Sequence, residues 1–331
     1  MNKDIERKII SILEILNNAT EPVGASFISE KLLERGIELS ERAVRYHLKL
    51  MDERGFTKVV GKKGRLITEK GREEIKNALV SDKLGFIISK IENLAFHVTL
   101  DKSNGKGNVV LNLSIVPKKD LKKALNIIGE ILKKGYGISE KVIIFEREDE
   151  EIVPGIIVPE KKAIIGTLCS VTIHGILIKN GIPVNAKLGG VLEIKAGETT
   201  RFLEAITYQG STLDPLEILI KSGMTSVINT VRRKEGKILA TFREIPLSAR
   251  DETEKILEEI KEIGLSGKIL LGKPNQEILA VPVTPGTAGL VIAGGLNPLA
   301  GVIEAGIDAE NKAMSIIYKY EDLIPIKELL D

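Results

Sequence analysis

Basic and aromatic side chains recur at helical spacing in the stretch Ser40–Gly55. At about 100° per residue, Val44, Leu48 and Met51 share one apolar face, and the opposite face and its flank carry cationic and phenolic groups. Such groups donate hydrogen bonds to phosphate oxygens and base edges, so the pattern predicts contacts with duplex DNA. The predicted groove contacts are Arg42, Arg45, Tyr46 and Lys49.

A basic turn follows this helix, between two stretches that predict short strands, Phe56–Val60 and Arg65–Thr68. From Ser40 to Arg65 there are eight Lys and Arg residues against three acidic ones, a net charge of +5, whereas the whole chain carries only +2. A local excess of this kind attracts phosphate backbones, although a solvated charged face is the simpler alternative. The predicted phosphate contacts are Lys62, Lys63 and Arg65.

Small hydroxyl and thiol side chains gather in a second stretch, GTLCSVT at 166–172. Alternation on a strand would place Thr167 and Cys169 on one side and Ser170 and Thr172 on the other. These groups suit a pocket for a polar ligand. The alternative is a buried strand whose hydroxyls bond locally and whose cysteine is a small core residue.

Further donors follow toward the C-terminus. Arg243 lies on a predicted strand edge, where its guanidinium would grip a carboxylate through two hydrogen bonds or form a structural ion pair. Thr225 and Ser226 form a donor-rich turn. Asn297 opens a predicted helix after two glycines, and backbone N–H groups at such a position bind anions.

Signatures of catalysis or metal binding are missing from the sequence. There is no nucleophile elbow, no phosphate-binding Walker loop and no HExxH motif. One cysteine and three well-separated histidines offer neither an internal disulfide nor a structural metal site. We therefore expect no enzyme, no metal and no cofactor. An enzyme carrying a DNA-binding head, and a winged helix used as a protein-interaction module, are the alternatives, and salt-dependent DNA binding separates them.

The elements that position the basic residues follow one another in a recognisable order. Helices are predicted at Asp4–Asn18, at Ser26–Arg35 and from Ser40, then the strand pair, and then a helix at Glu69–Val80. This is the order of a winged helix-turn-helix, here residues 1–80. Residues 81–96 are apolar and predict a connecting helix or dimer contact, or a helix that packs on the following domain.

Residues 97–331 predict a mixed α/β regulatory domain. A strand at Val109–Val116, a helix at Lys118–Lys134 and a strand at Lys141–Glu146 open it, and helices recur at 214–222, 249–263 and 297–305. The fold class is therefore α+β. No apolar run is long enough to span a bilayer and the N-terminus is no signal peptide, so we expect a cytoplasmic protein.

Two pairs of short motifs indicate an internal duplication. Residues 182–184 (IPV) match 281–283 (VPV), and 213–216 (LDPL) match 296–299 (LNPL). In the second pair, Asp214 or Asn297 would cap a helix, a proline would occupy its first turn, and Gly223 or Gly306 would end it. Ordinary helix caps with similar residues are the alternative.

Taken together, these motifs resemble the NrpR-type nitrogen-regulatory repressors of methanogenic archaea. The resemblance runs through both parts of the chain. It is most specific at GTLCSVT (166–172), GIPV (181–184), STLDPLE (211–217), FREIP (242–246) and GGLNPLAGVIEAG (294–306).

The resemblance implies an allosteric repressor that binds a palindromic operator as a homodimer or higher homo-oligomer. It further implies that 2-oxoglutarate is the effector that releases the operator, and that Cys169 is the family's conserved cysteine. The donors described above are compatible with this dicarboxylate, so the predicted effector-binding residues are Thr167, Cys169, Ser170, Thr172, Thr225, Ser226, Arg243 and Asn297. Several family members carry two regulatory domains and this chain has room for one. The sequence is therefore compatible with a protein that represses alone and with one that needs a second regulatory-domain protein.

Overall fold

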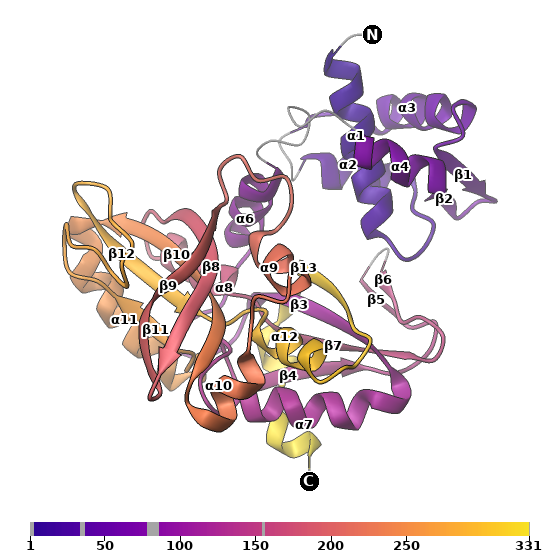
Figure 1. Cartoon of the computed structure of the whole chain (residues 1–331). Coiled ribbons are helices and arrows are strands. Elements are labelled where there is room, and N and C mark those ends of the chain that lie inside the picture. Colours follow the sequence, from indigo (N-terminus) through magenta and orange to yellow (C-terminus); the bar gives the residue numbers. More distant parts are fainter. Residues whose placement is uncertain (1–2, 34–36, 78–85, 154–155, 331) are drawn as a thin grey trace. The chain divides into compact units, whose positions relative to one another are not determined.

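Four helices and a two-stranded sheet form the N-terminal part of the computed structural model, which describes residues 3–33, 37–77, 86–153 and 156–330 (Figure 1). The elements are α1 (Lys3–Asn18), α2 (Ala25–Leu33), α3 (Glu41–Glu53), β1 (Thr57–Val60), β2 (Gly64–Ile67) and α4 (Glu69–Asn77). This order confirms the predicted winged helix-turn-helix. The predicted ends of the second and fourth helices, Arg35 and Val80, lie outside the described residues.

Helix α3 is fixed by its cap and its apolar face. The Ser40 hydroxyl accepts a hydrogen bond from the Ala43 N–H at 3.3 Å, as expected of an N-cap. Val44, Leu48 and Met51 are fully buried among side chains of α1 and α2. Burial of each such side chain stabilises the fold by about 2 kcal/mol, which holds the polar face of α3 outward.

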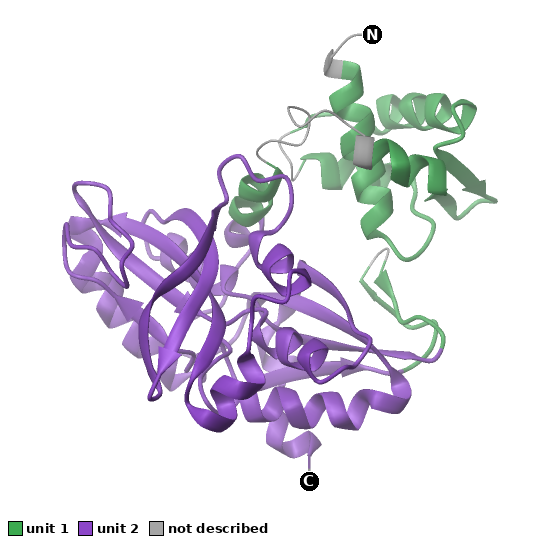
Figure 2. Cartoon of the chain, viewed as in Figure 1, with its two compact units in different colours: residues 1–93, 147–160 green, residues 94–146, 161–331 purple. Residues whose placement is uncertain are grey.

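The chain divides into two compact units (Figure 2). Unit 1 comprises residues 1–93 and 147–160, and unit 2 comprises residues 94–146 and 161–331. Helix α6 (Phe86–Phe96) begins in unit 1 and ends in unit 2, and residues 81–85 of the predicted connecting helix are outside the described residues. Strands β5 (Glu151–Val153) and β6 (Ile156–Ile157) form a hairpin that belongs to unit 1. No helix in the described ranges is long and apolar enough to cross a membrane.

Unit 2 contains two five-stranded sheets whose neighbouring strands are all antiparallel. The first has the order β13 (Glu310–Lys319), β3 (Asn108–Pro117), β7 (Lys162–Leu168), β4 (Lys141–Phe145), β14 (Ile324–Pro325). The second has the order β11 (Ile269–Leu271), β12 (Thr287–Ala293), β10 (Gly236–Pro246), β8 (Asn185–Lys195), β9 (Glu198–Thr207).

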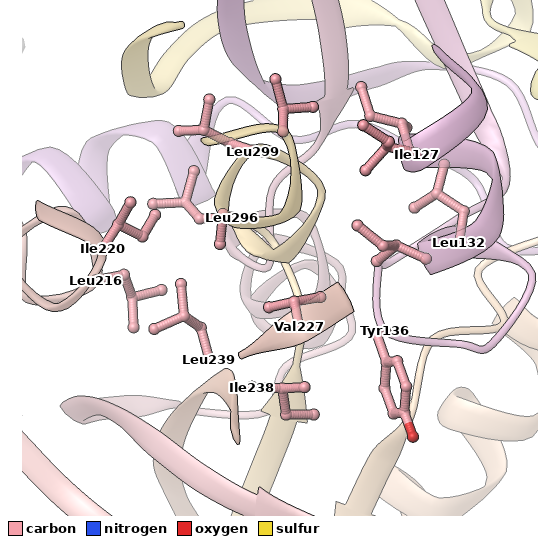
Figure 3. Packing of buried hydrophobic residues seen from close by; sticks show 14 of the residues in the cluster. Ile127, Leu132, Tyr136, Leu216, Ile220, Val227, Ile238, Leu239, Leu296 and Leu299 are labelled. Atoms are coloured by element: carbon pink, nitrogen blue, oxygen red, sulfur yellow. The ribbon is translucent and has the colours of Figure 1, made fainter. Parts of the chain in front are cut away.

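The helices of unit 2 are α7 (Leu121–Leu132), α8 (Val171–Lys179), α9 (Pro215–Lys221), α10 (Val227–Arg233), α11 (Arg250–Glu262) and α12 (Asn297–Glu304). Side chains from both sheets and from α7, α9, α10 and α12 share one hydrophobic core. Figure 3 shows part of it, with Leu216 and Ile220 of α9 on one side of α12 and Ile127 of α7 on the other. The two sheets are therefore held by one continuous apolar interior.

The topology of unit 2 shows an internal duplication. The series β3, α7, β4, β7, α8, β8 is repeated in order by β10, α11, β11, β12, α12, β13, and both first helices are preceded by a proline and a 3₁₀ turn. The last strand of each copy joins the other copy's sheet, because β8 pairs with β10 and β13 pairs with β3. The two copies are thus interlocked by exchange of a strand.

A pair of side-chain clamps fixes the register of the repeat. The Thr172 hydroxyl accepts from the Val110 N–H at 3.0 Å and donates to the Val110 carbonyl at 3.3 Å. The Asn297 amide does the same to Leu239, at 2.7 Å and 3.0 Å. Val110 and Leu239 occupy equivalent places in β3 and β10, and Thr172 and Asn297 equivalent places at the start of α8 and α12.

This register overturns the predicted motif pairs. Residues 182–184 precede β8, whereas 281–283 lie in the loop between β11 and β12, and α9 has no place in the repeated series. Asp214 is an N-cap as predicted, accepting from Leu216 and Glu217, and Gly223 and Gly306 end their helices with positive φ. Asn297 is not a cap, because its side chain is used on Leu239.

Candidate DNA interface and effector site

The polar face of α3 carries the predicted groove contacts. Arg42, Arg45, Tyr46 and Lys49 are all exposed, and Tyr46 has 63% of its surface accessible. Arg45 forms an ion pair with Glu41 one turn earlier, which is solvated and weak enough to be replaced by a phosphate. The helix therefore presents cations and one phenol on the side opposite its buried apolar face.

The wing presents two of the three predicted phosphate contacts freely. Lys62 and Lys63 are exposed in the turn between β1 and β2. Gly64 closes this turn with a φ of 126°, and a Cβ there would lie 2.3 Å from the Val23 carbonyl oxygen. The turn is thus held against the chain before α2, where Val23 and Arg65 exchange backbone hydrogen bonds at 3.1 Å.

Arg65 has a structural partner that the sequence did not indicate. Its Nε donates to the Asp52 carboxylate at 2.8 Å, and the Thr57 hydroxyl donates to the same carboxylate. Asp52 is on α3, so this arrangement ties α3 to both strands of the wing. The predicted role of Arg65 as a phosphate contact competes with this bracing role.

Arg243 is the centre of the candidate effector site. It lies in β10, the middle strand of its sheet, and only 1% of its surface is accessible, which corrects the predicted position on a strand edge. Its guanidinium donates to the Thr241 hydroxyl on the same strand and to the Ser170 hydroxyl at 3.2 Å. Ser170 belongs to the other copy of the repeat, so this contact bridges the two copies.

The GTLCSVT stretch is not one strand. β7 ends at Leu168, residues 169–170 form a turn, and α8 begins at Val171. Ser170 occupies the N-cap position but does not cap its own helix. The hydroxyl therefore faces Arg243, at an end of a helix whose dipole favours negative charge.

The Arg243 charge acts on two further buried side chains, His174 and Tyr208. Burial is the main cause that lowers the pKa of His174 to about 3, and the Arg243 charge adds to it, so the imidazole is neutral. Burial raises the pKa of Tyr208 well above its usual range; the Asp214 carboxylate and the Cys169 thiol act in the same direction, and the Arg243 charge opposes them. Cys169 is buried. The site is a desolvated region with one strong cation.

The other predicted effector residues are divided between this region and elsewhere. Thr167 is buried opposite Asn112 in the ladder of β7 and β3, and the Asn112 amide donates to the Gly295 carbonyl at 2.9 Å. Thr172 and Asn297 are occupied by the backbone clamps described above. Thr225 and Ser226 lie at the start of α10, where Thr225 donates to Glu304 and Ser226 accepts from the Lys237 N–H.

Four side chains near the site were missed by the sequence reasoning: Asn112, His174, Tyr208 and Thr241. Two had a usable signal. Thr241 precedes Arg243 by two residues, so both share one face of a strand. His174 follows Ser170 by four residues, the spacing of neighbours on a helix, but only once the helix is recognised. Asn112 and Tyr208 are brought in by folding alone.

Comparison with known proteins identifies the family of the chain. A model of the NrpR regulatory domains 1 and 2 matches residues 84–324, which is most of the chain. The chain belongs to the NrpR family. A model of the ribonuclease R winged-helix domain matches residues 10–75, in agreement with the fold of the N-terminal elements.

Relatives in the NrpR family are named global nitrogen regulators. That of Methanosarcina mazei, NrpRI, is 40% identical over 98% of this chain and 99% of its own length. Those of Methanocaldococcus jannaschii and Methanococcus maripaludis are 35% and 34% identical over 98% and 92% of this chain. The chain spans only 56% and 52% of the length of these two relatives.

A solved NrpR-like structure has the same fold as the larger part of this chain. It is a nitrogen repressor-like protein from Methanococcus jannaschii, with a TM-score of 0.60 and 33% identity over 72% of this chain and 98% of that chain. The matched relatives are regulators and the matched model describes regulatory domains. The chain is thus a nitrogen regulator with a winged helix, and not an enzyme.

Proposed function

We propose that this chain represses nitrogen-assimilation genes by binding a palindromic operator as a homodimer or higher homo-oligomer, and that 2-oxoglutarate releases it. The observation that carries the proposal is the exposed basic face of α3, together with the lysines of the wing, in a member of a family of nitrogen regulators. Two copies of such a helix would occupy half-sites about one helical turn apart, or a multiple of it.

The region around Arg243 supports 2-oxoglutarate as the effector. The buried guanidinium is held by two neutral hydroxyl acceptors, Thr241 and Ser170. A carboxylate that replaced one of them would form charge-assisted hydrogen bonds, which are about twice as strong as neutral ones. The N-terminal end of α8 would favour the same negative charge. A dicarboxylate fits these donors better than a neutral ligand does.

The DNA half of the proposal is tested by the salt dependence of operator binding. Fluorescence anisotropy with a promoter fragment from a nitrogen-assimilation operon should show affinity falling steeply between 50 and 200 mM salt. Arg42→Ala and Arg45→Ala should each weaken binding about tenfold, while Arg232→Ala, an exposed arginine of unit 2, should not. A DNA affinity that changes neither with the salt concentration nor on substitution of the α3 arginines would instead support a protein-interaction module.

The ligand half is tested by calorimetry on the free protein. We expect 2-oxoglutarate to bind, glutarate to bind more weakly, and Arg243→Lys to lose at least tenfold in affinity, because lysine cannot form a two-pronged contact. Equal affinities of Arg243→Lys and the unaltered protein would remove Arg243 from the site.

A further inference from the structure

The duplication of unit 2 places two loops in equivalent positions that differ in where they pack. One connects β4 to β7 and the other connects β11 to β12. The second loop folds back on its own unit: the Phe202 N–H donates to the Leu279 carbonyl at 3.1 Å, and Ile278, Val281 and Val283 pack against the hydrophobic core. This is the ordinary behaviour of a loop next to an apolar sheet.

The first loop belongs to the other unit. Its described parts, residues 147–153 and 156–160, are grouped with the winged helix in unit 1. The Ile157 N–H donates to the Thr20 hydroxyl oxygen at 2.7 Å, and Thr20 lies in the turn between α1 and α2. Val158 is fully buried and exchanges backbone hydrogen bonds with Asp149 and Glu150 across the hairpin. The hairpin is therefore a structured element with a specific contact.

A stiff strand joins this hairpin to the candidate effector site. β7 runs from Lys162, next to the base of the hairpin, to Leu168, two residues before Ser170. It is paired on both sides, with β3 and with β4, and its seven residues span about 23 Å. The base is pinned as well, because Lys118 donates from its N–H to the Lys161 carbonyl at 2.9 Å and from its Nζ to the Glu146 carbonyl at 3.2 Å.

We propose that the turn around Thr20 is a docking site for the hairpin of residues 147–160, and that this hairpin carries the effector response to the DNA-binding helices. The inference rests on the proposed function and names its regulatory route. A ligand that engages Arg243 alters the position of Ser170, β7 transmits the shift as a rigid element, and the hairpin moves the turn that precedes α2. The chain passes between the units at residues 93/94, 146/147 and 160/161, and the last two junctions are the two ends of this hairpin.

The test removes the hairpin contact and keeps both binding sites. Thr20→Val deletes the hydroxyl with little change of shape, and Thr20→Ser is the matched control that keeps it. Hydrogen exchange of the amides of residues 151–153 and 156–158 should become at least fivefold faster in Thr20→Val and stay unchanged in Thr20→Ser. Unchanged exchange in Thr20→Val would overturn the docking site, whether or not 2-oxoglutarate acts on the protein.

The same variants test transmission by their response to 2-oxoglutarate on the operator. Operator affinity without ligand should stay within twofold of the unaltered protein, and the 2-oxoglutarate concentration for half release should rise at least fivefold in Thr20→Val only. Faster exchange with unchanged release would overturn the role of the hairpin. Failure of the unaltered protein to be released would instead count against the proposed function, since the exchange measurement stands without it.

Discussion

At the scale of single residues, buried polar side chains of unit 2 have two different uses. Thr172 and Asn297 hold the backbone of β3 and β10, one clamp in each copy of the repeat. Arg243 and Ser170 instead connect the copies to each other. Ser114 and Gly295 stand at the matching places, where the copies are joined by the hydrogen bond from the Asn112 amide to the Gly295 carbonyl and the described structure has no cation. This asymmetry agrees with the proposed role of Arg243 as an effector contact.

The clamp predicts a measurable stability cost. Asn297→Leu removes both hydrogen bonds to Leu239, whose carbonyl keeps a second donor in the Gly294 N–H and whose N–H loses the Asn297 acceptor. We expect the free energy of unfolding to fall by about 1–3 kcal/mol, the cost of one buried group that loses its hydrogen bond. Urea denaturation measures this. Thr172→Ser, which retains the hydroxyl of the other clamp, should cost less than half as much; equal costs would contradict the account.

His174 predicts a pH dependence of stability. Its pKa is about 3 in the folded protein and ordinarily 6.5, so the unfolded chain binds a proton that the folded protein does not. The stability that depends on a neutral His174 is therefore fully present above pH 6.5. As the pH falls from 6.5 toward 3, the free energy of unfolding decreases by up to about 1.4 kcal/mol per pH unit. Denaturation at pH 7, 6 and 5 should show a shallower fall for His174→Asn than for the unaltered protein. Parallel curves would mean that His174 takes up its proton normally.

At the scale of elements, the wing depends on a brace as well as on its lysines. The Asp52 carboxylate of α3 accepts from Arg65 on β2 and from Thr57 on β1. Lys62 and Lys63, by contrast, touch nothing that fixes them in the described structure and are exposed. Residues adjacent in sequence thus have separate tasks.

This separation can be measured through the salt dependence of DNA binding. The slope of the logarithm of the binding constant against the logarithm of the salt concentration should be smaller by about one in Lys63→Ala, because one phosphate contact is lost. The melting temperature should stay unchanged. Arg65→Ala should leave the slope unchanged and lower the free energy of unfolding by about 1 kcal/mol, the upper range for a partly exposed ion pair. A lower slope in Arg65→Ala would show that Arg65 contacts DNA after all.

The sequence predicted local elements well and long-range contacts poorly. Helix α3, its cap Ser40 and the wing strands follow from spacing and capping chemistry, which act within a few residues. The exchanged strands pair with distant segments, because Ile194 of β8 lies opposite Gly236 of β10 and Lys319 of β13 lies opposite Asn108 of β3, and short motif matches gave the wrong register for this exchange. Ser170 was wrongly assigned to a strand. A short apolar run with β-branched residues is compatible with a buried strand and with a buried helix, so periodicity did not show where β7 ends and α8 begins. The contact of Ser170 with Arg243 depends on that fold and was out of reach.

At the scale of the whole molecule, one chain combines a basic winged helix with a regulatory unit that is duplicated and interlocked. The exchanged strands and the shared core hold the two copies of unit 2 together, so the proposed ligand at the contact between the copies would act on both of them. The winged helix is joined to that body by the chain at three points. In the proposed dimer, the ligand would favour one arrangement of the two winged helices over another.

In the proposed switch, ligand binding at Arg243 controls the basic helix in unit 1. It is tested most directly by titrating 2-oxoglutarate into the operator complex of the unaltered protein and of Arg243→Lys, at one salt concentration, with anisotropy as the readout. We expect saturating ligand to weaken operator binding by the unaltered protein at least tenfold and to leave Arg243→Lys unchanged, with equal affinities of the two proteins when ligand is absent. Operator binding by the unaltered protein that does not respond to 2-oxoglutarate, or an equal response of Arg243→Lys, would contradict it.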